Sequence, residues 1–272
     1  MLSTFFLLFT LTVFFLLVGR MVGGKRGMLV AFGLACILNF SAYWFSDTMV
    51  LAAYRAKPVA AGHRLERITH DLAMKAGIPV PSVHIIPSPS PNAFATGRNP
   101  DHAAVAATDG LLGMMGDREI AAVVAHELGH IHNRDTLVAT MAATLSGGVL
   151  ILSRMALFFG GGGSGWGKRI AVAVLAPAAA TLVTLAISRE REYEADAFSA
   201  RLTGRPMDLA RALLALERAV QRAPMPQHSP GTAHLFIVHP FSGVGMGRLF
   251  STHPPVEKRV ERLAAMRVEV RR

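Results

Sequence analysis

The sequence contains little charge and a single cysteine. Charged residues make up 17% of its 272 residues and hydrophobic residues 51%, whereas an average soluble protein has about 25% charged residues. The mean hydropathy is +0.38. A lone cysteine, Cys36, excludes an intramolecular disulfide, and its apolar surroundings predict a small hydrophobic role. The shortage of charge predicts surface that faces lipid.

A basic block with interleaved aromatic residues is also missing. The formal net charge is +10, but the 28 Lys and Arg residues are spread along the chain. Nucleic-acid binding needs such residues clustered on one surface, so the sequence predicts no nucleic-acid partner. Positive charge beside a membrane explains the basicity more simply.

Two uncharged segments near the N-terminus are typical of membrane spans. Residues 2–18 would reach about 26 Å as a helix, close to the ~30 Å hydrocarbon core of a bilayer. Residues 28–46 are again uncharged. The first segment has neither a basic region before it nor a small-residue cleavage pattern after it, which favours an anchor over a cleaved signal peptide. We expect residues 1–46 to form a transmembrane helical hairpin closed by a short basic loop.

Two later apolar segments, 136–153 and 170–188, are dominated by Ala, Gly, Ser and Thr. Small residues permit close helix contacts inside a membrane, yet the same composition suits helices buried in protein. The sequence predicts two membrane-associated helices within residues 136–188 and leaves open whether they cross the bilayer. Loop charges do not decide the orientation.

The remaining sequence predicts a domain that is mainly α-helical with a small β-sheet. Residues 62–76 place apolar side chains on one helical face, and residues 83–86 have the β-branched content of a strand. Segments 93–96 and 103–108 flank a turn-rich stretch, which indicates a β-hairpin. We expect a sheet of about three strands, one at an edge, within residues 47–135.

A helix is predicted after Asp117, a suitable N-terminal cap. Within it His126 and His130 are four residues apart, so both imidazoles project from one face and can bind one tetrahedral zinc ion. Glu127 lies beside them, where a carboxylate can take a proton from the attacking water and deliver it to the leaving amine. A buried helix can also carry two hydrogen-bonded histidines. Zinc is favoured because this polar patch costs free energy unless it is paired or metal-bound.

A catalytic zinc ion takes three protein ligands, so a third is needed. The segment 188–200 contains two carboxylate pairs at helical spacing, Glu190 with Glu194 and Glu192 with Asp196. Periodicity does not choose between them, and a solvated charge cluster is the plain alternative. We expect residues 189–272 to complete the catalytic domain and to end in a helix.

Four motifs then occur in order: PNAFATG near residue 91, HELGH followed by NRDT, REYEAD, and THPPVEKRVERL at 252–263. Together they resemble the HtpX family of membrane zinc peptidases, of the gluzincin type. The resemblance implies that Glu192 is the third zinc ligand and that Asp196 contacts a zinc histidine. It also implies a cytoplasm-facing catalytic domain at a bacterial inner membrane, and a role in clearing misfolded membrane proteins.

Further residues follow from the same motifs. His253 occupies the matching position of the family motif and is expected to stabilise the transition state by donating to its oxygen, with a merely structural histidine as the alternative. Arg259 is a weaker candidate for that role. The expected edge strand would bind an extended peptide through its main chain, with a turn-forming Asn92 as the alternative for that residue. The substrate-binding residues predicted there are Asn92, Ala93, Phe94 and Ala95.

Two other classes of protein remain as alternatives. A type I CaaX prenyl protease also combines HExxH with a distal glutamate in a membrane, but it is usually much longer. A membrane adaptor could keep a structural zinc ion, although such sites favour four ligands and cysteine. Spacing alone suggests that both metal-bearing helices extend the apolar segments, which would place the zinc ion near the membrane surface. The alternative is that these segments are only anchors, joined to the catalytic domain by a flexible break at Asn133–Asp135. We therefore expect membrane proteins as substrates and the lipid bilayer as a partner.

Overall fold

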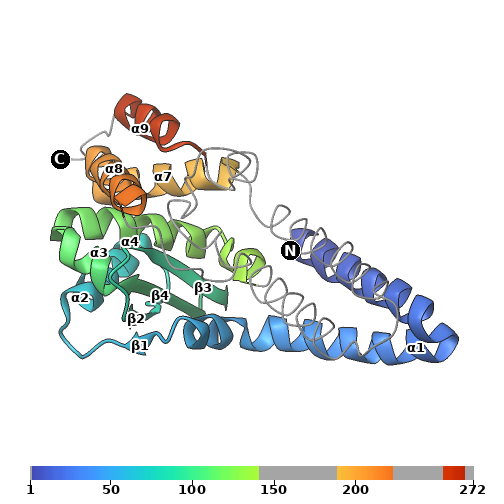
Figure 1. Ribbon diagram of the computed structural model, residues 1–272. Helices are drawn as coiled ribbons and strands as arrows, with labels where there is room; N and C mark the ends of the chain where they lie inside the picture. The colour runs from blue at the N-terminus through green and yellow to red at the C-terminus, as the bar shows by residue number, and fades with distance from the viewer. Residues whose placement is uncertain (1, 141–188, 223–253, 267–272) are drawn as a thin grey trace.

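The computed structural model describes residues 2–140, 189–222 and 254–266 (Figure 1). Its first element, α1 (Leu2–Ala53), is interrupted at Gly23 and Gly24, whose backbone is not helical. The two arms fold back on each other at this interruption. A hydrogen bond joins them, in which the Asn39 side-chain amide donates to Thr12 Oγ1 at 2.9 Å. Among the described residues one helical stretch, Gly23–Phe45, is long and apolar enough to cross a membrane.

The second arm of α1 continues past this stretch to the sheet. Aromatic residues near the end of the stretch are exposed, Trp44 among them, and the Arg98 guanidinium lies 4.7 Å from the centre of the Trp44 ring. Tyr54 directly follows the end of α1, and the centre of its ring lies 5.2 Å from the centre of the Phe94 ring. These contacts align the strand that carries Phe94 and Arg98 with the last turns of α1.

Helix α2 (Arg64–Ala76) has the predicted amphipathic face and ends as expected. Leu65 is fully buried, and Gly77 takes the left-handed conformation at φ 68° that ends the helix. This conformation strains any residue with a Cβ, which explains the glycine. The Leu65 N–H is bound by the His63 side chain, which caps the other end.

The sheet has four strands in the order β1–β2–β4–β3: β1 (Lys57–Pro58), β2 (Ser82–Ile86), β4 (His102–Thr108) and β3 (Ala93–Asn99). β3 and β4 form the predicted hairpin, with Ala95 opposite Val105, and β2 runs parallel to β4. β3 lies at one edge, as expected. The two-residue β1 was not predicted, because its pairing with β2 depends on how α1 delivers the chain to the sheet.

Alternation along the strands divides the core between the two faces of the sheet. Ala93, Ala95 and Val105 pack toward the larger core that contains α4. Phe94 and Ala106 face the other way and pack against Val50 of α1 and against Tyr54, which directly follows α1. The sheet therefore separates α1 from α4, as Figure 1 shows.

Helix α3 (Asp109–Met114) precedes α4 (Asp117–His132), whose predicted apolar stripe is buried. The expected cap at Asp117 was wrong: Gly116 occupies the N-cap, and its N–H is bound by the Glu119 carboxylate at 3.1 Å. Asp117 instead lies in the first turn, where negative charge is favourable near the positive end of the helix dipole.

A helical layer covers the other side of α4 (Figure 1). It consists of α7 (Arg189–Thr203), α8 (Pro206–Arg222) and α9 (Val256–Ala265). Helices α7 and α8 pack on α4, and α9 packs on both of them. The chain is thus mostly helical with a small mixed sheet, and α4 lies at its centre. The apolar segments expected within 136–188 fall outside the described residues except for 136–140, which are helical.

Candidate metal centre

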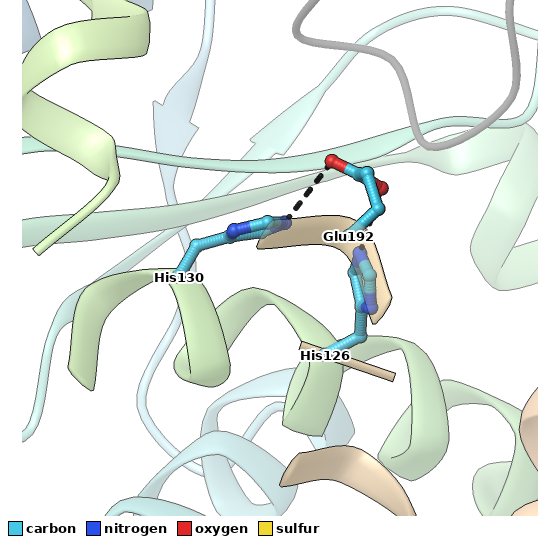
Figure 2. Close-up of side chains that lie close together, drawn as sticks. All are labelled: His126, His130 and Glu192. Carbon is cyan, nitrogen blue, oxygen red and sulfur yellow. Dashed lines mark ion pairs between the residues drawn. The ribbon is translucent and has the colours of Figure 1, made fainter. Parts of the chain in front are cut away.

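His126 and His130 point from one face of α4 toward Glu192, as the helical spacing predicts for the two histidines (Figure 2). Their rings are 4.8 Å apart and almost perpendicular. His126 is completely buried. Neither ring belongs to the apolar stripe of α4, so the two histidines form a separate polar face inside the protein.

Helix α7 brings Glu192 to this face, and Gly129 explains how the helices approach so closely. A Cβ on Gly129 would lie 3.1 Å from the Ala195 Cα and 3.3 Å from the Phe198 Cβ. The Glu192 carboxylate is 3.7 Å from His126 Nε2 and 3.6 Å from His130 Nε2. Glu190 and Glu194 are exposed on the same helix, so of the two carboxylate pairs only Glu192 and Asp196 face the histidines.

The geometry of these three side chains fits a zinc ion. One ligand atom from each of His126, His130 and Glu192 lies within 4.8 Å of the others. Zinc at its usual bond lengths in a tetrahedral site separates its ligand atoms by about 3.3 Å. The two distances from the Glu192 carboxylate to the histidines, 3.6 and 3.7 Å, exceed this by a few tenths of an ångström and involve its two different oxygens. Two imidazoles with one carboxylate are an established donor set for a catalytic site that keeps a position for water.

Glu127 lies between this group and the edge of the sheet. Its carboxylate is buried and accepts a hydrogen bond from the Ala95 N–H at 2.7 Å. Burial raises the pKa of Glu127 to about 7, although the neighbouring His130 opposes the shift. A carboxyl group with this pKa can both accept and release a proton near neutral pH.

A buried inner cluster supports His126 from behind; it consists of His126, Asp196 and Arg259. Asp196 Oδ1 is 3.0 Å from His126 Nδ1, and the Arg259 guanidinium donates to both carboxylate oxygens at 2.8 and 2.6 Å. The Arg259 side chain is 0% exposed and that of Asp196 2%. Burial alone would raise the pKa of Asp196, but Arg259 and His126 hold it lowered to about 2.

A second, outer cluster supports His130 in the same way; it consists of His130, Asp135 and Arg191. Asp135 Oδ2 is 3.4 Å from His130 Nδ1, and Asp135 Oδ1 is 3.3 Å from Arg191 Nε. Burial alone would lower the pKa of His130, but Asp135 and Glu192 raise it to about 9. Helical periodicity gave no signal for Asp135, because a residue five positions after His130 would point away from it on a continuous helix.

The chain leaves the helix immediately after α4, contrary to the expectation of one continuous helix. Asn133 is the C-terminal cap of α4. Arg134, the next residue, adopts a left-handed conformation at φ 59°. The Asp135 N–H then returns to the His130 carbonyl at 2.9 Å. The interruption turns Asp135 back toward His130.

The edge strand presents alternate backbone groups to its two sides. The Asn92 carbonyl accepts from Thr108 of β4, so the backbone of Asn92 and Phe94 faces β4, whereas that of Ala93 and Ala95 faces away from it. The Phe94 side chain packs against Tyr54 and the Asn92 side chain is buried. Beyond Ala95, the edge is covered by Thr140, whose hydroxyl contacts Thr96 and Gly97. His253 lies outside the described residues.

Comparison with known proteins agrees with this geometry. The model of Peptidase family M48 matches residues 60–267. The chain is 48% identical to a protease HtpX homolog of Desulfatibacillum aliphaticivorans over 96% of this chain and 88% of that protein. It is 49% identical to the homolog of Syntrophobacter fumaroxidans, over 96% and 97% of the two chains. The homolog of Pyrococcus furiosus is 48% identical, over 93% and 91%.

Among solved structures, Ste24p of S. mikatae matches with a TM-score of 0.51 and 20% identity. The match covers 91% of this chain but only 60% of Ste24p, and at this identity it shows a common fold. The sequence relatives, in contrast, are matched along most of their own length as well. The chain therefore belongs to peptidase family M48, as an HtpX-type membrane metallopeptidase that hydrolyses peptide bonds.

Proposed function

We propose that this protein is a zinc-dependent endopeptidase that cleaves membrane proteins in an extended conformation. The observation that carries the proposal is the meeting of three elements at Glu127: the three donor side chains, the proton-accepting carboxylate, and the edge of the sheet. His126, His130 and Glu192 would hold the metal ion. A zinc ion bound there polarises the scissile carbonyl and makes a water molecule acidic.

In this proposal Glu127 transfers the proton during peptide hydrolysis. Its carboxylate would accept a proton from the attacking water and pass it to the nitrogen of the broken peptide bond. The Ala95 N–H holds one carboxylate oxygen at 2.7 Å, which fixes its direction. Asp196 and Arg259 would keep the His126 ring in one orientation, because the Nδ1 side is occupied and Nε2 faces Glu192.

The test is a comparison of metal content and activity in the purified, detergent-solubilised protein. Glu127→Gln should bind one zinc ion per chain and lose self-cleavage and peptide hydrolysis by about 10²–10⁴-fold. His126→Ala, His130→Ala and Glu192→Ala should lose both zinc and activity, whereas Glu190→Ala should lose neither. A Glu127→Gln protein with normal turnover, or stoichiometric zinc in Glu192→Ala, would contradict the assignment.

The substrate is proposed to add to the sheet beside β3, along Asn92, Ala93, Phe94 and Ala95. The backbone of Ala93 and the Ala95 carbonyl would supply the main-chain hydrogen bonds, because the Ala95 N–H already binds Glu127, whereas Asn92 and Phe94 would shape the strand from its other side. Main-chain pairing tolerates many side chains, which suits an enzyme that removes damaged or misfolded proteins. Ala95→Pro disturbs this edge and also removes the N–H that holds Glu127, so a strong rise in KM and a fall in turnover are expected with zinc still bound; unchanged kinetics would contradict edge binding.

Membrane substrates are proposed because β3 runs back toward the membrane. Arg98 contacts Trp44 near the end of the candidate span, and Ala95 is three residues away along the strand, or about 10 Å. A peptide beside Ala95 would therefore lie close to the lipid surface. The cytoplasmic orientation in an inner membrane rests on the HtpX-type relatives and can be tested by protease accessibility of the catalytic domain in inside-out vesicles; protection there would contradict it.

His253 is proposed to donate to the oxygen that becomes negative in the transition state. It lies two residues before Pro255, which caps α9, and α9 delivers Arg259 to the metal centre. His253→Ala should lower turnover by about 10²-fold or more with zinc content intact. Normal turnover in this variant would remove His253 from the mechanism.

A further inference from the structure

We infer that Asp135 and Arg191 form a positioning pair for the metal centre. In this inference, which rests on the proposed zinc site, Asp135 fixes the ring of His130 and Arg191 fixes Asp135. Because Arg191 directly precedes Glu192, the same pair joins the end of α4 to the turn of α7 that carries the third ligand. The pair would therefore hold two of the three metal ligands in register.

The two oxygens of Asp135 have separate partners. Oδ2 is 3.4 Å from His130 Nδ1, and Oδ1 is 3.3 Å from Arg191 Nε. A carboxylate at Nδ1 selects the tautomer with its proton on that nitrogen and leaves Nε2 free to bind a metal. His130 Nε2 is the nitrogen that faces Glu192, at 3.6 Å from its Oε1.

The backbone after α4 is shaped to bring Asp135 into this position. Arg134 adopts φ 59°, a conformation that residues other than glycine rarely take. The Asp135 N–H then binds the His130 carbonyl at 2.9 Å, and the Asp135 carbonyl accepts from the Ala139 N–H at 3.2 Å. Asp135 therefore contacts His130 through both backbone and side chain while it begins the next helical turn.

The inner cluster provides an independent reason for this assignment. There, too, an aspartate meets the Nδ1 of a metal-facing histidine and an arginine binds the aspartate. The aspartates come from different elements, Asp196 from α7 and Asp135 from the loop after α4. Two unrelated segments thus produce the same arrangement around the two histidines, which a merely structural ion pair at the surface would not require.

The test measures zinc affinity by competition with a chromophoric chelator. Asp135→Ala should raise the zinc Kd by about 10–100-fold. Arg191→Met should raise it less, because Asp135 stays beside His130. The double variant should bind zinc no more weakly than Asp135→Ala alone, because Arg191 is proposed to act on the metal centre through Asp135. Glu190→Ala, an exposed carboxylate adjacent to Arg191, is the matched control and should leave the Kd unchanged.

A spectroscopic measurement separates positioning from general stability. With Co²⁺ in place of zinc, the visible absorption bands report the geometry around the ion, and Asp135→Ala and Asp135→Asn should shift them while Glu190→Ala should not. Should Asp135→Ala fail to fold, Asp135→Asn carries the test, because it keeps the size of the side chain but loses the ion pair. Unchanged zinc Kd and unchanged Co²⁺ bands in Asp135→Asn and Arg191→Met would overturn the inference.

The backbone turn offers a second way to test the same pair without touching it. Arg134→Gly keeps the left-handed conformation accessible and should leave the zinc Kd unchanged, whereas Arg134→Val disfavours it and should weaken zinc binding as Asp135→Ala does. Equal zinc affinity in both variants would contradict the role of this turn. Failure of wild-type protein to bind zinc in these titrations would instead refute the proposed zinc site itself.

Discussion

The two sides of the metal centre have the same chemistry in different surroundings. In the inner cluster, Arg259 is 0% exposed and binds both oxygens of Asp196. In the outer cluster the Arg191 side chain is 26% exposed and that of Asp135 13%, and Arg191 Nε lies 3.3 Å from Asp135 Oδ1. Water can compensate a broken contact on the outer side but not on the inner side. The same substitution should therefore affect folding on one side and mainly metal binding on the other.

The largest expected effect is that of Asp196→Ala. It leaves the buried Arg259 charge without its bidentate partner, which costs about 3–5 kcal/mol of unfolding free energy. Arg259 then has Glu192 within 3.5 Å and would compete with the metal for it. Thermal unfolding of the metal-free protein in detergent measures the first effect. Asp135→Ala is the control and should cost about 1 kcal/mol or less; equal losses on the two sides would refute the contrast.

The replacement of arginine by lysine sharpens the comparison without removing charge. Arg259→Lys should weaken zinc binding about tenfold or more, because one ammonium group cannot bind both Asp196 oxygens in the geometry of a guanidinium. Arg191→Lys should have less effect, since its ion pair with Asp135 is partly exposed and an ammonium group can also form it. Zinc titrations of the two variants, side by side, give the measurement. A larger loss for Arg191→Lys would reverse the assigned roles.

Gly129→Ala tests the contact that both clusters share. The new methyl group would lie 3.1 Å from the Ala195 Cα, so α7 must move and carry Glu192 with it. Such overpacking costs about 1–3 kcal/mol, and zinc affinity should fall as well. Gly113→Ala in α3 is the control, because a Cβ there meets nothing within 4 Å. Thermal unfolding and zinc titration of both variants give the measurement. Normal zinc binding in Gly129→Ala would contradict the prediction, because it would show that α4 and α7 can separate without a loss of zinc affinity.

The smallest expected effect lies beside the edge strand. Thr140→Val keeps the shape of the side chain but removes the hydroxyl that lies 3.0 Å from Thr96 Oγ1, which should cost about 1 kcal/mol of stability. Thr69→Val, whose hydroxyl bonds only within α2 among the contacts described, should cost less. Thermal unfolding compares the two.

Much of the local structure could be predicted from the sequence because it depends on neighbouring residues. The apolar stripe of α4, the stop at Gly77 and the β3–β4 hairpin all follow from periodicity and turn chemistry. The spacing of His126 and His130 fixes their common face for the same reason. Four ordered motifs also identified the family, which the comparisons show.

Packing decided what periodicity could not. Two carboxylate pairs on α7 have identical spacing, Glu190 with Glu194 and Glu192 with Asp196. Only the packing of α7 on α4 beside Gly129 distinguishes them, because it buries the second pair and leaves the first exposed. The N-cap of α4 was predicted at Asp117 and lies at Gly116, because two adjacent polar or small residues compete for the same position.

The sequence by itself determined a mainly helical fold with a small sheet, the helix with its two histidines, and the kind of chemistry expected of these residues, since each depends on spacing along a single element. Only the tertiary structure decided which residues stand behind the histidines. Asp135 reaches His130 through a left-handed turn, and Arg259 reaches Asp196 from a helix 63 residues further along the chain. Such contacts depend on how separate elements pack, and no local pattern encodes the distance between them.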